Sequence, residues 1–231
     1  MKRQSMNRWQ AFSIHLCISS VIFVTLLFII VAFWYPGVFI YLGGWLGIKI
    51  VAAVDMVLGP LLTLIIFNPA KKTLKIDLTI IAALQISCLA YGIWTIEQQR
   101  PLVQALLDDR LYVIPKAQYK TVDIKLDFLN KIPGLSPKMV MLNLPDNHSI
   151  IAMEVVNGFY VGNPVHLQTQ KYIPITNVVD NNTYQEKLMW RLSRLDFDRE
   201  RNCYWLPAES SYYKGELCFS PELGAIAQRS F

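Results

Sequence analysis

The chain has 231 residues, of which 53% are hydrophobic, and carries a formal net charge of +5 at pH 7. Residues 1–96 hold seven Lys or Arg against two acidic residues, whereas residues 97–231 hold 15 basic and 15 acidic residues. The excess of positive charge therefore belongs to the apolar N-terminal part, where it reports membrane orientation. Nucleic acid is excluded as the expected partner.

Three long apolar runs occupy residues 12–34, 46–67 and 76–96. A hydrocarbon core of about 30 Å needs about 20 apolar residues in a helix, and each run is long enough. A cleaved signal peptide is the alternative for the first run, but the apolar part of a signal peptide is shorter than this run and no A-x-A site follows. The fold class we predict is membrane α-helical, with three transmembrane helices, followed by an α+β domain over 97–231.

Basic residues flank the apolar runs on one side only. The connection between the first two runs carries no charge, whereas the N-terminus and the second connection are basic. The positive-inside rule then places residues 1–11 and the loop 68–75 in the cytoplasm, and three spans place 97–231 on the opposite side. We therefore predict a bacterial inner-membrane protein with a periplasmic domain. The basic residues in question are Lys2, Arg3, Arg8, Lys71, Lys72 and Lys75.

The second run contains an acidic residue near its middle, Asp55. A carboxylate at that depth costs several kcal/mol unless it is paired, protonated or facing a polar cavity. Asp55, Gly59 and Thr63 recur at every fourth residue and share one helix face, and Pro60 within this stripe predicts a kink. Two interpretations stay open. Asp55 holds its own bundle together through Gln85 or a hydroxyl, or the face that includes Pro60 binds another protein's transmembrane helix. A proton pathway is disfavoured because one acid has no relay.

Small residues in the apolar runs predict close helix packing. Gly43 and Gly47 are spaced for a small-xxx-small contact, and the third run has a polar ridge at every fourth residue, beside Gln85 at about the depth of Asp55. The ridge consists of Thr79, Ala83 and Ser87. His15, near the start of the first run, is predicted to be interfacial.

The C-terminal domain is large enough to bury its own core. A capping box from Thr183 to Glu186 predicts a helix with a buried stripe and a solvent face. The stripe consists of Leu188, Leu192 and Leu195, and the solvent face of Lys187, Arg191 and Arg194. The other expectations follow from apolar alternation and from turn residues. The predicted elements are a helical extension over 97–109, strands over 111–115, 139–144 and 155–161, and helices over 119–131 and 183–195.

The cysteines and histidines bear on compartment and chemistry. Cys203 and Cys218 flank a stretch rich in Tyr, Ser and Gly, and an oxidising periplasm favours a disulfide-closed hairpin over two free thiols. Neither His148 nor His166 has the spacing of a metal ligand, and no catalytic motif is present. We therefore expect no metal, no cofactor and no enzymatic activity.

The sequence VDMVLGPLLTLIIF over residues 54–67, followed by Asn68-Pro69 and the pair Lys71-Lys72, resembles the signature of the TfpX/TfpZ family of type IV pilin accessory proteins. The resemblance covers roughly residues 10–100 and is looser beyond. It implies an inner-membrane protein, encoded beside a major pilin, that supports surface piliation of that pilin. It supplies no catalytic residue.

Together these features predict a non-enzymatic accessory factor of type IV pilus biogenesis that binds the major pilin. The face formed by Asp55, Gly59 and Thr63 would bind the pilin helix in the membrane, and residues 97–231 would bind the pilin head. Membrane lipid and the inner-membrane pilus assembly machinery are the further expected partners. The alternative is a small transporter or signalling subunit with a periplasmic sensing domain, although the two cytoplasmic segments offer it little output surface.

Overall fold

The computed structural model of the protein describes residues 6–230, which form two compact units. The helical unit extends to Pro36 and resumes from Gly44 to Glu97. The C-terminal unit consists of Gly37–Gly43 together with the chain from Gln98 onward. Lys2 and Arg3, which contribute to the predicted orientation, lie outside the described residues.

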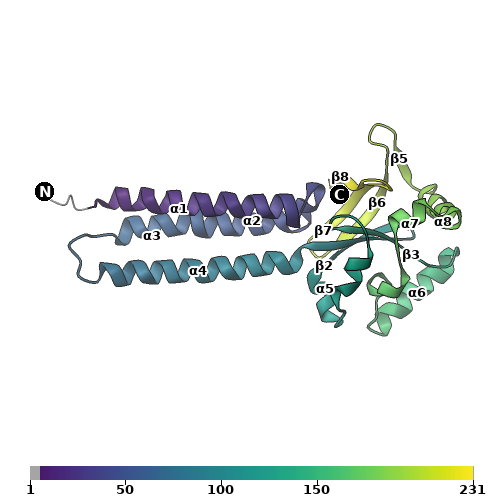
Figure 1. Cartoon of the computed structure of the whole chain (residues 1–231), viewed down its shortest axis with the longest axis horizontal. Helices are drawn as coiled ribbons and strands as arrows, with labels where there is room; N and C mark the ends of the chain where they lie inside the picture. The colour runs from purple at the N-terminus through teal and green to yellow at the C-terminus, as the bar shows by residue number, and fades with distance from the viewer. Residues whose placement is uncertain (1–5, 231) are drawn as a thin grey trace. The chain divides into compact units, whose positions relative to one another are not determined.

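The helical unit contains three helical stretches that are long and apolar enough to cross a membrane, as the sequence predicts (Figure 1). They begin and end within four residues of the predicted spans, at residues 8–34, 44–66 and 74–99. The first is α1 (Arg8–Ile29) with the π-helical segment η1 (Ile30–Trp34), the second is α2 (Gly44–Ala52), the π-helical segment η3 (Ala53–Leu58) and α3 (Gly59–Ile66), and the third is α4 (Leu74–Gln99).

The irregularity that Pro60 imposes on the second stretch is a widened turn that precedes the proline. In η3 the Gly59 N–H donates to the Val54 carbonyl, five residues back instead of four. Pro60 then lies in the first turn of α3, where the missing N–H has little cost. Asp55 lies within η3, and π-helical turns of this kind are frequent at functional positions.

The C-terminal unit is a mixed α/β domain built on one eight-stranded sheet, with the strand order β4-β3-β1-β2-β6-β7-β8 and with β5 paired to β6. The pairs β1–β3 and β2–β6 are parallel and the remaining pairs are antiparallel. The elements are β1 (Pro101–Leu107), β2 (Arg110–Pro115), α5 (Lys116–Thr121), η4 (Leu126–Lys131), β3 (Lys138–Leu142), α6 (His148–Tyr160), η5 (Val165–Leu167), η6 (Thr169–Lys171), β4 (Tyr172–Pro174), α7 (Ile175–Val179), α8 (Asn182–Leu192), β5 (Asp196–Asp198), β6 (Cys203–Ser210), β7 (Tyr213–Ser220) and β8 (Gly224–Ser230).

Strand β1 lies inside the sheet, between β3 and β2, and is buried along its whole length. The predicted helical extension over 97–109 is therefore wrong beyond Gln99, where α4 ends. A strand that is covered on both faces is a continuous apolar run, and periodicity does not distinguish such a run from a buried helix. Pro101 begins the strand, where a proline is tolerated.

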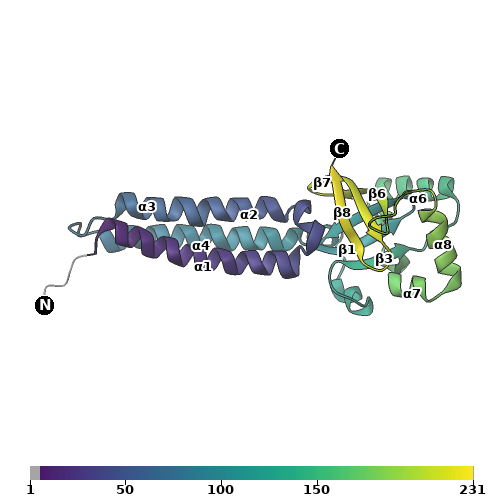
Figure 2. The same cartoon turned by 90° about the horizontal axis from the view of Figure 1, so that it is seen from above.

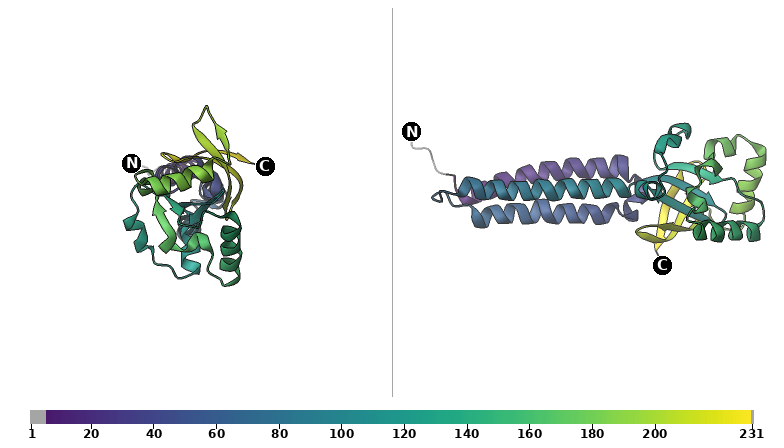
Figure 3. Two further views of the ribbon diagram at one scale, coloured as in Figure 1. Left: turned by 90° about the vertical axis from the view of Figure 1, so that its right-hand side faces the viewer. Right: turned by 90° about the horizontal axis from the view of Figure 1, so that it is seen from below.

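Both faces of β1 are covered by the same chain. Helices α5 and α6 lie beside the sheet (Figure 3), and Tyr119 and Ile151 share a buried cluster with Val103 and Ala105 of β1. On the other face the sheet curls so that β7 and β8 cross over β1 (Figure 2), and the Ala225 N–H donates to Gln104 Oε1 at 3.0 Å. The curl gives the domain a core without a second sheet.

Two helices of this domain differ from their predictions. The predicted helix over 119–131 is broken, because Asp123 adopts a φ of 53° and separates α5 from the 3-10 turn η4. The predicted strand over 155–161 is wrong: that segment is the second half of α6, whose N-cap Asn147 accepts hydrogen bonds from the N–H groups of Ser149 and Ile150. Its run of Val, Phe and Tyr has strand propensity, and the cap and tertiary packing override it.

Helix α8 exists as predicted, but its ends differ. Its N-cap is Asn181, whose side chain accepts from the N–H groups of Thr183 and Tyr184, so the predicted capping box does not begin the helix. The helix ends at Leu192 and not at residue 195. Leu188 and Leu192 are buried as expected, whereas Leu195, beyond the end of the helix, is only half-buried.

The first connection, Gly37–Gly43, belongs to the C-terminal unit. Gly43 has a φ of 127°, and a Cβ placed there would lie 3.0 Å from Tyr212 Cδ2 in the turn between β6 and β7. Gly43 therefore contacts the domain and does not form the predicted helix-packing pair with Gly47.

The strands β6 and β7 form the predicted hairpin, and a Cys203–Cys218 disulfide joins them with the Cα atoms 5.4 Å apart. Both cysteines are completely buried. The other two cysteines, Cys17 and Cys88, are free and exposed on their helices. The pairing predicted from the sequence is thus confirmed.

Replacing both Cys203 and Cys218 by serine is expected to lower the free energy of unfolding by about 3 kcal/mol, because a loop of this length loses the crosslink in the unfolded chain. Chemical denaturation of the full chain in detergent measures the change. The matched control is the double variant Cys17→Ser/Cys88→Ser, which should unfold at the midpoint of the unmodified protein. Equal midpoints for both double variants would contradict a stabilising role for the disulfide.

Candidate partner-binding site

The polar stripe of the second stretch faces inward. Asp55 and Thr63 are each only 4% exposed, and Gly59 and Pro60 are buried beside them. One interpretation of the sequence requires this stripe to form an open docking face. In the helical unit the stripe is instead buried. The physical reason is the cost of exposing a carboxylate and a hydroxyl to an apolar surrounding, which favours an inward orientation.

Glycines allow α4 to approach this stripe. A Cβ placed on Gly59 would collide with Gln85 Nε2, and one placed on Gly47 would lie 2.5 Å from Ile96 Cγ1. The close approaches between the second stretch and α4 are thus those of Gly59 to Gln85 and of Gly47 to Ile96. A Cβ placed on Gly92, also on α4, would lie 3.5 Å from Val51 Cγ2, which is an ordinary van der Waals distance.

The predicted packing ridge of α4 lies on its outer surface. Thr79, Ala83 and Ser87 are exposed, and the two hydroxyls donate to carbonyls of their own helix, at 2.8 Å to Lys75 O and 2.9 Å to Ala83 O. The spacing of small residues predicted that this ridge is the packing face of α4. The buried face of α4 is a neighbouring face, which contains Ile81. The ridge therefore does not pack the described bundle.

A polar contact joins the first and second stretches. His15 Nδ1 lies 2.6 Å from Thr63 Oγ1, which also donates to the Gly59 carbonyl at 3.1 Å. His15 is thus a partner of the stripe and not only an interfacial residue. Asp55 Oδ2 is buried with no hydrogen-bond partner among residues 6–230. Whether Asp55 serves assembly or a partner stays a prediction.

An open groove of about 300 Å³ lies beside Thr63, between α1, α3 and α4. Its walls are mainly apolar, and the polar groups that border it belong to His15, Thr63 and Gln85. Asp55 does not line it. The apolar part of the lining consists of Met6, Ala11, Ile14, Ile18, Phe67, Leu78, Ile81 and Ala82. The helical unit therefore offers a groove that a neighbouring helix ridge can enter, at the edge of the predicted stripe.

Gly59→Ala is expected to lower the stability of the bundle by about 1–3 kcal/mol, because the added methyl group displaces the Gln85 side chain. Thermal unfolding in detergent measures the effect. Gly92→Ala is the control, and it should be neutral since its new Cβ meets only ordinary contacts. Adding Gln85→Ala to Gly59→Ala should restore stability; a failure to restore it would mean that Gln85 is not the obstructing group.

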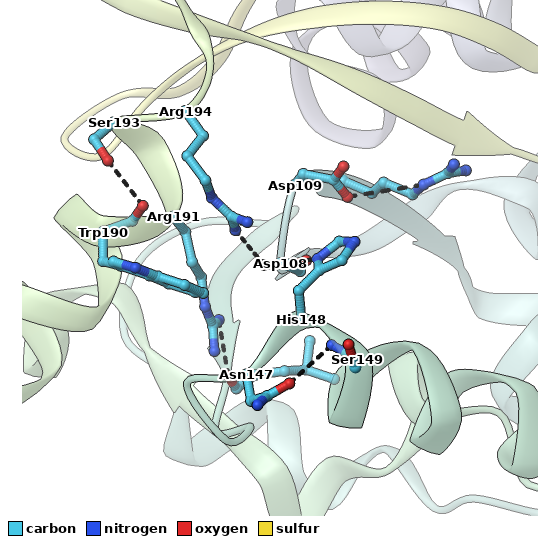
Figure 4. A network of polar contacts seen from close by, with 11 residues as sticks. Asp108, Asp109, Asn147, His148, Ser149, Trp190, Arg191, Ser193 and Arg194 are labelled. Atoms are coloured by element: carbon cyan, nitrogen blue, oxygen red, sulfur yellow. Dashed lines mark hydrogen bonds and ion pairs between the residues drawn. The ribbon is translucent and has the colours of Figure 1, made fainter.

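The C-terminal domain has a separate polar network centred on Asp108 (Figure 4). Asp108 lies in the turn between β1 and β2 with a φ of 50°, and its side chain is buried. Arg194 Nη2 donates to Asp108 Oδ1 at 2.7 Å, and His148 Nδ1 contacts the other oxygen. The Arg194 guanidinium also lies 4.2 Å from the Trp190 ring centroid. One carboxylate thereby links the central hairpin to the start of α6 and the end of α8.

Arg191, predicted to face solvent, is completely buried. Its Nη1 donates to the Leu142 carbonyl at 3.0 Å, at the end of β3. Burial lowers the pKa of the Arg191 guanidinium from its usual value, and the nearby Asp108 opposes that shift. The helical period of α8 did not reveal this, because an arginine at the boundary of an apolar stripe is ordinarily solvated.

His166 is the other buried titratable group that sequence reasoning left without a role. Its ring stacks on Tyr112 with centroids 4.5 Å apart and planes within 5°, and it is 8% exposed. Burial lowers the pKa of His166 to about 4. No sequence signal distinguishes such a histidine, since the stacking partner is 54 positions away in the chain.

The low pKa of His166 predicts a loss of stability in acid. An unfolded histidine takes up a proton near pH 6.5, whereas folded His166 does so only near pH 4, so the free energy of unfolding falls as the pH is lowered from 6.5 to 4. The shift corresponds to about 3 kcal/mol. In His166→Phe, which keeps a ring on Tyr112, this part of the pH dependence should vanish. Denaturation of the full chain in detergent at pH 4 and 7 tests it, and an unchanged slope would contradict the assignment.

Comparisons with known proteins give a coarse identification. The chain is 32% identical over 121 residues to the fimbrial assembly protein of Dichelobacter nodosus serogroup E1, 33% identical to that of serogroup I, and 31% identical to that of serogroups C1 and C2. The matched stretch is 50% of this chain; it spans less than half the length of the first two relatives, 44%, but 87% of the third. No family model and no solved structure matches the chain.

Proposed function

The chain belongs to the family of fimbrial assembly proteins, and on that premise we propose that it is an inner-membrane accessory factor of type IV fimbria biogenesis that binds the fimbrial subunit. The three apolar stretches cross the membrane with residues 1–11 and 68–75 in the cytoplasm. The C-terminal domain lies in the periplasm, and the buried Cys203–Cys218 disulfide is in keeping with that oxidising compartment. The protein acts by binding and not by catalysis.

The groove between α1, α3 and α4 is the observation that carries this proposal. Lipid-facing helices associate through close packing and a few polar contacts, and this groove combines apolar walls with the polar edges of His15, Thr63 and Gln85. An apolar subunit helix that bears a small polar residue would find both kinds of contact. Thr63 borders the groove directly, whereas Asp55 and Gly59 are buried and do not line it.

The two units give the protein two places to hold one partner. A fimbrial subunit that waits in the membrane has an apolar helix and a folded periplasmic part. Two weak contacts on the same partner gain affinity through effective concentration, provided both can form at once. Because each contact alone is weak, an accessory factor of this kind can bind the subunit firmly enough to assist assembly and still release it.

A photoreactive side chain at Ile18, inside the groove, should crosslink to the fimbrial subunit in intact cells. Ile86, which is exposed on α4 but does not line the groove, is the control and should give no such adduct. Ala82→Trp fills the groove and should reduce the number of surface fimbriae while the protein is still made, whereas the neighbouring Ala83→Trp should not.

Equal adducts from Ile18 and Ile86, or equal loss of fimbriae in the two tryptophan variants, would contradict a specific groove. Deletion defects in cells that lack the subunit would instead favour the sensor or transporter alternative.

A further inference from the structure

A second groove lies in the C-terminal domain, between α6 and the sheet at β2 and β6. It consists of two adjoining hollows of about 490 and 420 Å³ that share Tyr112, Phe159 and Glu209. The first hollow ends at the Asp108–His148 contact, and the second reaches Thr121 and the turn after β6. The groove is therefore long enough to hold a segment of chain rather than a single side chain.

Apolar side chains remain exposed along this groove. Val156 and Phe159, which line it from α6, are 54% and 56% exposed, and Met153 and Tyr160 continue the exposed surface of the same helix. The Asp108 network fixes the start of α6 to the central hairpin, so this surface is held on a rigid support. Exposed apolar surface of this extent on a folded domain marks an interaction site.

The charges of the groove are unbalanced. Asp108 is neutralised by Arg194, and Asp109 lies 3.9 Å from Arg110. Glu209 is exposed at the centre of the groove and forms no ion pair among residues 6–230. Lys214 lies opposite Glu209 in the register of β6 and β7 but forms no ion pair with it in the described residues. The Glu209 carboxylate can therefore pair with a lysine or arginine within an apolar segment.

We infer that the groove between α6, β2 and β6 binds an apolar segment of the periplasmic part of the fimbrial subunit, with a basic side chain of that segment paired to Glu209. The inference rests on the proposed function and names the surface of the second contact. Phe159 and Val156 supply the apolar contact at its centre, where aromatic anchors contribute most to binding.

Other occupants fit the charges less well. An anionic membrane surface would be repelled by Glu209 and by Asp109 at the rim. A second copy of the chain, docked through the same surface about a two-fold axis, would bring two identical acidic rims together. A segment of a different protein meets neither obstacle.

The test uses the full chain in cells that produce the fimbrial subunit. A photoreactive side chain at Phe159 should form an adduct with the subunit, whereas one at Leu135, which is exposed outside the groove, should not. Glu209→Lys should reduce the Phe159 adduct about tenfold, as expected for loss and reversal of one interfacial charge pair. Glu222→Lys, an exposed acid outside the groove, is the matched control and should leave the adduct unchanged. A lysine or arginine of the captured segment changed to glutamate should restore the adduct in Glu209→Lys.

Each contrary outcome is distinct. An adduct at Ile18 without one at Phe159 would overturn this inference and leave the proposed function standing. No adduct at either position would overturn both. Equal adducts at Phe159 and Leu135, or an adduct between two copies of the chain at Phe159, would show that the groove does not select the subunit.

Discussion

The arrangement of the helical unit depends on one constraint: a carboxylate in an apolar helix must turn inward. Asp55 sets the face of the second stretch that is buried, and Gly59 and Thr63, one and two turns later, follow it into the bundle. Gly59 then lets Gln85 of α4 lie against its backbone, and Thr63 meets His15 of α1. Both neighbouring helices are therefore positioned by the stripe that the acid creates.

The wide turn η3 belongs to the same arrangement. Pro60 has no N–H to give, and the helix adjusts within the turn that contains Asp55 and not at the proline itself. One extra residue in a helical turn rotates the side chains that follow relative to those before. The groove beside Thr63 begins after this turn, where α3 lies between α1 and α4.

The sequence predicted the features that depend on length and local chemistry: three apolar helices, the strands β2 and β3, the hairpin and its disulfide. It did not predict those that depend on tertiary partners. Strand β1 was mistaken for helix because it is covered on both sides, and the second half of α6 was mistaken for strand because its valines and aromatics suit either state. The burial of Arg191 and the pairing of Asp108 with Arg194 join positions far apart in the chain, and no local pattern encodes them.

Exposed apolar side chains have different meanings in the two units. In the helical unit a bilayer would cover them, so Ile86 or Trp94 on the surface of α4 requires no partner. In the C-terminal domain, which we propose to be periplasmic, the exposed side chains of α6 lose contact with water only if another protein shields them. Because Asp108 holds α6 in place, those side chains cannot relieve their exposure by folding back onto the sheet. The groove they line is therefore retained at a cost in stability, which binding of the proposed subunit segment would offset.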